Sequence, residues 1–331
     1  MTPFTPPLVS VVTPVYNGEA TIAECIESVL AQTYPNFEYL IQDNASTDRT
    51  AEIVGAYAGR DSRIRVRRNP SLVTAMQNHE LAFDGMAEAS RYCKVVHADD
   101  WIFAECLERM VALAEENPSV RMVSAYRLEE EYVTLDGLPY PSTVVPGREI
   151  CRRALLGEVY VFGTPTSLLL RTDAVRERTP FYDEINFPRH WDTAVAYEIL
   201  KQGDLGFVHQ VLTFTRREGA VRTTTSVEMG SSMPEHLGML KRYGPDFLSA
   251  EEYTARLRAM TRNYYRFIGA AALRRPGREF WKYHRESLRR LGLPSGPIRI
   301  GRASAGAAAG TLLRPLANIP RYFGEQSKAE H

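Results

Sequence analysis

Residues 9–50 read VSVVTPVYNGEATIAECIESVLAQTYPNFEYLIQDNASTDRT. One apolar run ends at TPVYNG (residues 13–18), and a second apolar run ends at DNASTD (residues 43–48). Two strands that each stop at a polar loop, with a helix between them, are typical of half of a nucleotide-binding α/β sheet. Ligands of such sheets bind beyond the carboxyl ends of the strands. We therefore expect a binding site at these two loops.

Apolar runs continue to alternate with helical periodicity as far as Leu128. The order predicts an α/β fold with a mostly parallel sheet flanked by helices. Thr21 and Glu24 have the spacing of a capping box at the start of the first helix. The expected strands are Leu8–Thr13, Phe37–Gln42, Ile64–Arg67, Tyr92–Val96 and Val120–Tyr126, and the expected helices are Thr21–Gln32, Asp48–Ala58, Thr74–Ala89 and Ala104–Asn117.

A stretch from Glu129 to Arg148 is richer in Pro, Gly and Thr and predicts a bridge into a second lobe. After Gly244 the pattern becomes helical. We therefore expect three parts, residues 1–130, 131–245 and 246–331. The elements expected in the last two are strands at Thr166–Leu170 and Gly206–Thr215 and helices at Asp192–Lys201, Ala250–Ala272 and Pro276–Leu291.

The charge of the chain is unevenly distributed although its formal net charge is zero. Residues 251–331 hold 16 Lys and Arg against 6 Asp and Glu, which leaves 24 against 34 for residues 1–250. A basic tail indicates either an anionic membrane surface as partner or an Arg-rich helix face that packs on the acidic body. The basic residues follow no known nucleic-acid module, so we expect no nucleic-acid partner.

The cysteines and the chain start indicate the compartment. Cys25, Cys93, Cys106 and Cys151 lie far apart without a CxxC pair, which predicts buried thiols in a reducing environment. Met1–Pro7 lacks the basic region of a signal peptide, and the apolar stretch Ala303–Leu313 is too short to span a membrane. We expect a cytoplasmic protein, with peripheral attachment to the inner face of the cell membrane as the role open to the tail.

Acidic side chains follow the ends of two expected strands. Adjacent carboxylates are costly to hold together without a cation, so Asp99 and Asp100 are a candidate site for Mg²⁺ or Mn²⁺. The alternative is that one of them caps the next helix and the other is solvated. Asp43 is suited to accept a hydrogen bond from the imide N–H of uracil or thymine, although a turn alone would explain its segment. Tyr16 is either a flat face for a base or a core residue.

Taken together, these motifs resemble family 2 inverting glycosyltransferases with the GT-A fold. The resemblance rests on the order of strand-TPVYN, strand-QDNASTD and strand-HADD, and it covers roughly residues 8–217. It implies a nucleotide-sugar-binding half in residues 1–130, an acceptor-binding and catalytic half in residues 131–245, and a helical basic extension in residues 246–331.

The resemblance also implies roles for single residues in a nucleotide-diphospho-sugar site. Thr13, Pro14 and Tyr16 would line the base and ribose pocket, and Asp43 would read the base. Asp99 would contact ribose or sugar, and Asp100 would be the main ligand of Mn²⁺ or Mg²⁺ on the diphosphate. Many relatives have a further Asp two positions before Asp99, where this chain has His97. His97 is then a neutral substitute near the ribose.

On the acceptor side, Gly163 and Thr164 belong to the loop FGTPTSL, which resembles the family's acceptor loop, where small residues leave room for the sugar. Asp192 stands where the family places a carboxylate before a helix, which makes it the expected general base. The alternatives are that the loop is only a turn and that Asp192 only caps the helix. Trp191 is either a platform for the sugar or a buried residue. His209, Arg216 and Arg217 are further residues that would approach the diphosphate.

The expected function is a metal-dependent inverting glycosyltransferase of the hexosyltransferase type. It would move a sugar from a UDP- or dTDP-sugar to a saccharide or lipid-linked acceptor, in the synthesis of cell-surface polysaccharide or glycoconjugate. One alternative is a non-catalytic nucleotide-sugar-binding or scaffold protein with the same fold, which the His97 and Glu218 departures allow. A nucleotidyltransferase is disfavoured because no Gly-rich phosphate loop with a following basic residue comes after the first strand.

Overall fold

The computed structural model describes residues 6–183, 187, 190–216, 230–273 and 276–296. The chain forms two compact units. The first contains Met1–Ala154 and Glu158–Thr223, and the second contains Leu155–Gly157 and Thr224–His331.

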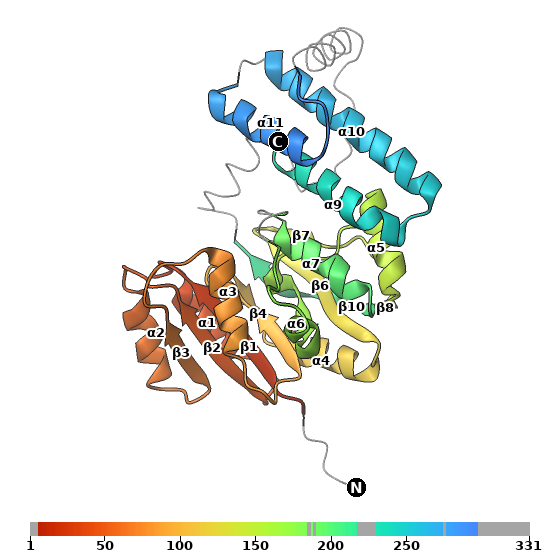
Figure 1. Cartoon of the computed structure of the whole chain (residues 1–331). Helices are drawn as coiled ribbons and strands as arrows, with labels where there is room; N and C mark the ends of the chain where they lie inside the picture. The colour runs from red at the N-terminus through yellow and green to blue at the C-terminus, as the bar shows by residue number, and fades with distance from the viewer. Residues whose placement is uncertain (1–5, 184–186, 188–189, 217–229, 274–275, 297–331) are drawn as a thin grey trace, which may run out of the picture. The chain divides into compact units, whose positions relative to one another are not determined.

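The first unit is built on one mixed sheet (Figure 1), with strand order β3-β2-β1-β4-β9-β6-β10-β5. The strands β1 to β4 run parallel, β9 is antiparallel to both of its neighbours, and β10 is parallel to β6. The strand bounds are β1 Val9–Val15, β2 Phe37–Asp43, β3 Ile64–Arg68, β4 Tyr92–Val95, β5 Trp101–Ile102, β6 Val120–Glu129, β7 Tyr132–Thr134, β8 Val144–Val145, β9 Leu169–Arg171 and β10 Asp204–Thr215.

Helices flank the sheet, as the sequence predicts, and the predicted α/β order up to Leu128 is confirmed. In the first unit they are α1 Ile22–Leu30, α2 Thr50–Ala58, α3 Ala75–Asp84, α4 Cys106–Glu116, α5 Gly147–Leu156, α6 Thr172–Arg176 and α7 Trp191–Leu200, with a 3-10 turn, η1, at Pro165–Ser167. In the second unit they are α9 Ser232–Phe247, α10 Ala250–Leu273 and α11 Arg278–Arg290.

The strand period of two decides which side chains of β1 enter the core. Val9, Val11 and Val15 belong to a buried cluster with residues of α1 and α4, such as Ile26 and Leu107. The opposite face of β1 and β2 is covered by α3, which lies in front of these strands in Figure 1. The loops that follow β1, β2 and β4 therefore leave a sheet that is packed on both faces.

Two local predictions are wrong. The Thr21 side chain makes no capping hydrogen bond. Its backbone N–H donates to the Gly18 carbonyl oxygen instead of the Glu24 side chain, and Glu24 Oε2 lies 2.6 Å from Arg216 Nη2. The strand predicted to begin at Thr166 begins at Leu169, because Pro165 starts a 3-10 turn that Thr164 and Ser167 cap reciprocally.

The second unit is helical, in agreement with the predicted extension. The Tyr264 hydroxyl lies 2.8 Å from Nδ1 of His284, which ties α10 to α11, and Ile268 and Leu288 are fully buried. The sequence reading missed α9 before Gly244, and it missed α5 in the first unit. Among the described residues, none of the helices is long and apolar enough to cross a membrane. The four cysteines are free and buried, as predicted.

Candidate nucleotide and metal site

The loops after β1 and β2 are joined by hydrogen bonds. Asn17, with a φ of 51°, donates its backbone N–H to Ser46 Oγ and accepts from the Thr47 N–H through its side-chain oxygen. The Gly18 N–H donates to Thr50 Oγ1 at 2.8 Å. These bonds hold the two loops side by side at one edge of the sheet, where the sequence analysis predicts the nucleotide site.

Asp43 lies at the end of β2 and is only 2% exposed. Its Oδ1 accepts the Ser46 N–H at 3.0 Å, and its Oδ2 lies 3.0 Å from Arg68 Nη1. The two charges attract, but Oδ2 accepts no hydrogen bond from any described residue. A buried carboxylate oxygen without a hydrogen-bond donor is costly, so this atom is suited to receive a ligand N–H.

The expected base pocket residues differ in accessibility. Tyr16 is 47% exposed directly after β1, so its ring is available to a ligand. Pro14 is buried. Thr13 is fully buried and its hydroxyl lies 3.0 Å from the Tyr39 hydroxyl, on the core side of β1. The Thr13 side chain therefore faces the core under α1, and only its backbone is open to a lining role.

The loop after β4 gathers three candidate metal ligands. One ligand atom each of His97, Asp99 and Asp100 lie within 4.8 Å of one another. Asp99 is exposed, His97 is partly exposed, and Asp100 is 3% exposed. Within the described chain, neither carboxylate forms an ion pair with Lys or Arg, although His97 Nδ1 lies 3.9 Å from Asp100 Oδ2. Two adjacent carboxylates and one imidazole fit a divalent cation.

Asp100 is fixed from two sides. Its Oδ1 accepts the Arg216 backbone N–H at 3.1 Å, and its Oδ2 accepts the Thr166 hydroxyl at 2.6 Å. Burial raises the pKa of Asp100 to about 6, and the neighbouring Asp99 charge adds to the rise. Arg216 also donates through Nε to the Asp99 carbonyl oxygen, so the end of β10 closes over this loop.

The turn that carries Thr166 depends on Gly163. Its φ is +65°, and a Cβ there would lie 2.5 Å from Ser167 Oγ. Fully buried Lys94 donates from Nζ to the Thr166 carbonyl oxygen at 2.6 Å. Thr164 begins the turn and its hydroxyl lies 3.5 Å from that of Thr215. The predicted acceptor loop thus supports Asp100.

Asp192 lies in the first turn of α7 and is partly exposed. Its Oδ1 accepts the Thr193 N–H at 2.7 Å, and no described residue donates to its Oδ2. Burial raises the pKa of Asp192 to about 6 in spite of the Thr193 hydrogen bond, which lowers it. A small cavity borders both Asp192 and Pro165. The carboxylate therefore lies beside the turn that holds Asp100.

An aromatic cluster connects Trp191 to His97, one of the candidate metal ligands. The Trp191 ring lies 4.1 Å from that of Tyr182 and 5.3 Å from that of His79, and the His79 ring lies 5.4 Å from that of His97. His79 is 6% exposed, and its burial lowers its pKa to about 3. Trp191 is partly exposed, so its packing and a sugar contact are compatible.

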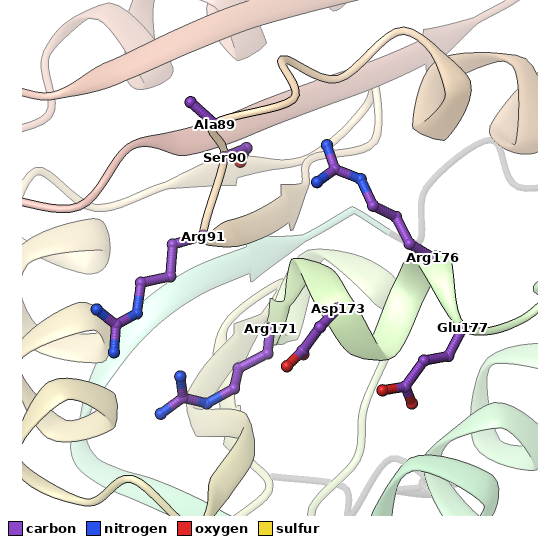
Figure 2. A pocket seen from close by; sticks show the side chains of 7 residues that line it. All are labelled: Ala89, Ser90, Arg91, Arg171, Asp173, Arg176 and Glu177. Atoms are coloured by element: carbon purple, nitrogen blue, oxygen red, sulfur yellow. The ribbon is translucent and has the colours of Figure 1, made fainter.

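A cavity of about 530 Å³ lies elsewhere, at the opposite end of β4 (Figure 2). Its arginines are held by the protein itself. Arg91 pairs with Glu115, Arg171 donates to the Val120 carbonyl oxygen, and Arg176 donates to the Glu88 carbonyl oxygen. These contacts hold the segments around β4 together and already occupy the three guanidinium groups. We therefore assign no ligand to this cavity.

The sequence reading did not identify several residues that support the site. Arg68 approaches Asp43, Lys94 and Thr166 support Asp100, and His79 contacts His97. Arg68 ends β3, which pairs with β2, so its position at a strand end could have indicated its place beside Asp43. The other contacts join segments up to 72 residues apart, as in the bond from Lys94 to Thr166. Of the expected diphosphate residues, His209 lies 2.7 Å from both Tyr126 Oη and the Ser142 carbonyl oxygen, and Arg217 lies outside the described residues.

Comparison with known proteins agrees with the geometry. The family described as Glycosyl transferase family 2 matches residues 10–178. An uncharacterised glycosyltransferase of Bacillus subtilis, EpsJ, is 37% identical over 113 residues, which are 34% of this chain and 31% of that relative. The chain thus spans less than a third of the length of EpsJ.

Solved structures share the fold. Staphylococcus aureus TarS 1–349 in complex with UDP superposes with a TM-score of 0.60 at 17% identity, over 89% of this chain and 82% of that one. The mannosyltransferase PcManGT of Pyrobaculum calidifontis, in complex with GDP-Man and Mn²⁺, has a TM-score of 0.54 at 15% identity, over 95% and 78% of the two chains. The predicted GT-A fold is confirmed.

Proposed function

Because the chain belongs to glycosyl transferase family 2, we propose that this glycosyltransferase moves a sugar from a UDP- or dTDP-sugar to a saccharide or lipid-linked acceptor, with inversion at the anomeric carbon. The observation that carries the proposal is the parallel pairing of β2, β1 and β4, which brings the loops of Asp43 and of Asp99–Asp100 to one edge of the sheet, with Asp192 beside Pro165. Cell-surface polysaccharide or glycoconjugate synthesis is the process that such a reaction serves.

The donor site follows from Asp43 Oδ2, which forms an ion pair with Arg68 but accepts no hydrogen bond from the described residues. Uracil and thymine present an imide N–H, and Asp43 Oδ2 is buried without a donor among the described residues. Exposed Tyr16 supplies a flat surface for the ring. The diphosphate then extends toward Asp99 and Asp100.

Asp99 and Asp100 would hold the divalent cation, which supplies positive charge to the leaving diphosphate when it is bound. Hydrogen bonds from Thr166 and Arg216 hold the Asp100 carboxylate in place. The Asp99 side chain is exposed and therefore accessible to an ion. The chain's own contribution is therefore a buried carboxylate, Asp100, held by two hydrogen bonds beside the exposed carboxylate of Asp99.

Asp192 is the proposed general base. In a single displacement, the acceptor oxygen forms its bond to the anomeric carbon as the bond from that carbon to the diphosphate breaks. The acceptor hydroxyl must lose its proton to a base within hydrogen-bond reach. The Oδ2 of Asp192 is accessible for this, while Oδ1 is held by Thr193.

The test is a panel of nucleotide sugars incubated with the full chain, Mn²⁺ and mixed saccharide or lipid-linked acceptors. We expect one donor class to release its nucleoside diphosphate. Release of pyrophosphate would instead indicate nucleotidyl transfer. Donor binding, seen as a raised melting temperature, without any release would support the non-catalytic alternative.

Activity should depend on pH through Asp192. Because burial raises its pKa to about 6, the carboxylate is protonated at lower pH and accepts no proton. We expect kcat at saturating donor and metal to fall about tenfold per pH unit below about 6 and to be level between about 7 and 8. Stopped assays from pH 5 to 8 measure this, and a kcat that stays level to pH 5 would remove Asp192 from the base role.

Asp43→Asn should weaken UDP binding. An Asn side chain has one oxygen and one NH₂ group. Wherever the NH₂ group points, it faces a donor, which is the Ser46 N–H, the Arg68 guanidinium or the imide N–H of the base. We expect the Kd of UDP, measured by calorimetry, to rise about tenfold to a hundredfold, as for an unsatisfied buried polar group. The affinity for CDP should fall less than that for UDP, because the cytosine ring offers a hydrogen-bond acceptor to the side-chain NH₂ group of the Asp43→Asn variant. Asp61→Asn, which changes a pair with Arg63 at the other end of β3, is the control.

We propose peripheral attachment to anionic lipid through α11. This helix buries Phe280, His284, Ser287 and Leu288. It exposes five cations, Arg278, Lys282, Arg285, Arg289 and Arg290, against two carboxylates, Glu279 and Glu286. Each cation near such a surface contributes about 1 kcal/mol. The double substitution of Arg285 and Arg289 by Glu should therefore reduce sedimentation with phosphatidylglycerol vesicles more than tenfold. Equal sedimentation of both proteins would contradict the proposal.

A further inference from the structure

We propose that His97 is itself a ligand of the divalent metal, through Nδ1, and that buried His79 positions it by fixing its tautomer. The inference rests on the proposed function, which assigns a metal to Asp99 and Asp100. It adds a nitrogen ligand to that site and names a residue of α3 as its support.

The argument begins with the hydrogen bonds of His79. Its Nδ1 lies 2.7 Å from the carbonyl oxygen of Ala75, one turn earlier in α3. A carbonyl oxygen only accepts, so Nδ1 of His79 carries the proton. A neutral imidazole has one N–H, so Nε2 of His79 is an acceptor. The ring is enclosed by those of Tyr182, Trp191 and His97, away from water.

The tautomer of His97 follows from that of His79. The two Nε2 atoms lie 3.2 Å apart, and because that of His79 accepts, Nε2 of His97 must donate. Neutral His97 therefore has its lone pair on Nδ1, and this is the nitrogen that lies 3.9 Å from Asp100 Oδ2. Two acceptors at that distance share no hydrogen bond.

The spacing instead suits two ligands of one ion. Metal–nitrogen and metal–oxygen bonds of about 2.0–2.2 Å place two ligands about 3 Å apart when adjacent and about 4 Å apart when opposite. Asp99 completes the cluster, since one ligand atom from each of the three side chains lies within 4.8 Å of the others. The alternative is a doubly protonated His97 that forms an ion pair with Asp100 and itself offsets the acidic charge.

A nitrogen ligand changes which ions the site prefers. Mg²⁺ prefers oxygen ligands, whereas imidazole suits later transition metals. We therefore expect Co²⁺ to bind much more tightly than Mg²⁺. In His97→Asp the site becomes all oxygen, so the ratio of Mg²⁺ to Co²⁺ affinity should rise at least about tenfold.

The experiment is proton NMR of the full chain, labelled with ¹⁵N-histidine, during titration with Co²⁺ in the presence of UDP. A histidine bound through Nδ1 keeps its Nε2–H, which the paramagnetic ion shifts far from the normal range. We expect one such exchangeable signal, absent in His97→Asn. In His79→Phe, which keeps the ring packing, that proton should broaden by exchange with water, and the Co²⁺ Kd should rise about 10–100-fold.

His236→Asn is the matched control, because His236 lies in α9, where its Nδ1 is 2.7 Å from the Ser232 carbonyl oxygen, and it has no role in the proposed site. It should leave the shifted signal in place. If His79→Phe does not fold, His97→Asn and His97→Asp still decide whether His97 is a ligand, and the ¹⁵N shifts of His79 in the wild type show whether its Nε2 is the acceptor that the tautomer argument requires.

The possible failures are distinguishable. Co²⁺ binding that is lost in Asp100→Ala but unchanged in His97→Asn, with no shifted N–H signal, would overturn the His97 proposal and leave the proposed metal site standing. If UDP binding and sugar transfer are unaffected by chelation of all metal, the metal part of the proposed function fails, and the role of His97 fails with it.

Discussion

Asp192→Asn is expected to lower kcat by about 10²–10⁴-fold or more, the usual contribution of a general base. The amide does not accept the acceptor's proton, yet it keeps the size of the side chain and an oxygen for the Thr193 N–H. The Kd of the donor should therefore stay within about twofold. Single-turnover product formation and donor calorimetry measure the two quantities separately.

The chain contains a matched control for the capping alternative. Asp173 occupies the first turn of α6 and accepts the N–H of Ala174 at 2.6 Å, as Asp192 accepts that of Thr193. Asp173→Asn changes the same chemistry at a helix start outside the proposed site and should leave kcat unaltered. Equal effects of the two substitutions, or full turnover by Asp192→Asn, would return Asp192 to a capping role.

The sequence was sufficient for the part of the fold that local pattern determines. The strands and helices up to Leu128 follow from apolar periodicity and polar strand ends, and these same ends contain Asp43, Asp99 and Asp100. The predicted capping box does not form, because the Thr21 N–H donates to the Gly18 carbonyl oxygen and the Glu24 side chain pairs with Arg216, 192 residues away. The sequence spacing of Thr21 and Glu24 shows neither of these competing contacts.

The residues that hold the candidate site in place could not be predicted from the sequence, because their contacts also join distant segments. Thr166 and Lys94 meet only because β9 inserts antiparallel beside β4, a topology that short strands do not reveal. Thr13 shows the converse case, since the strand period already directs its side chain to the Val9 and Val11 face. The family resemblance implied a place for Thr13 in the base pocket, and the alternation directs its side chain to the core, which leaves its backbone for that role.

Asp100→Ala should abolish metal-dependent stabilisation by the donor. A donor at about 100 times its Kd stabilises the folded state by about 2.7 kcal/mol, which is about 5–10 °C in melting temperature for a domain of this size. We expect this shift in the wild type with Mn²⁺ and the UDP-sugar, and none in the variant. Asp84→Ala, an exposed position on α3, should retain the full shift.

Asp100→Asn separates metal binding from folding. At pH 7 the ionised Asp100 costs folding free energy in the metal-free protein, because burial has raised its folded pKa to about 6 from 3.8. That cost is present above the folded pKa and disappears as the pH falls toward the unfolded value. In EDTA at pH 7 we therefore expect Asp100→Asn to melt at or above the wild-type temperature, while its response to Mn²⁺ and donor is lost. A variant that melts lower in EDTA and still gains the wild-type shift with Mn²⁺ would mean that Asp100 is a structural acceptor for Thr166 and Arg216 and that the metal binds elsewhere.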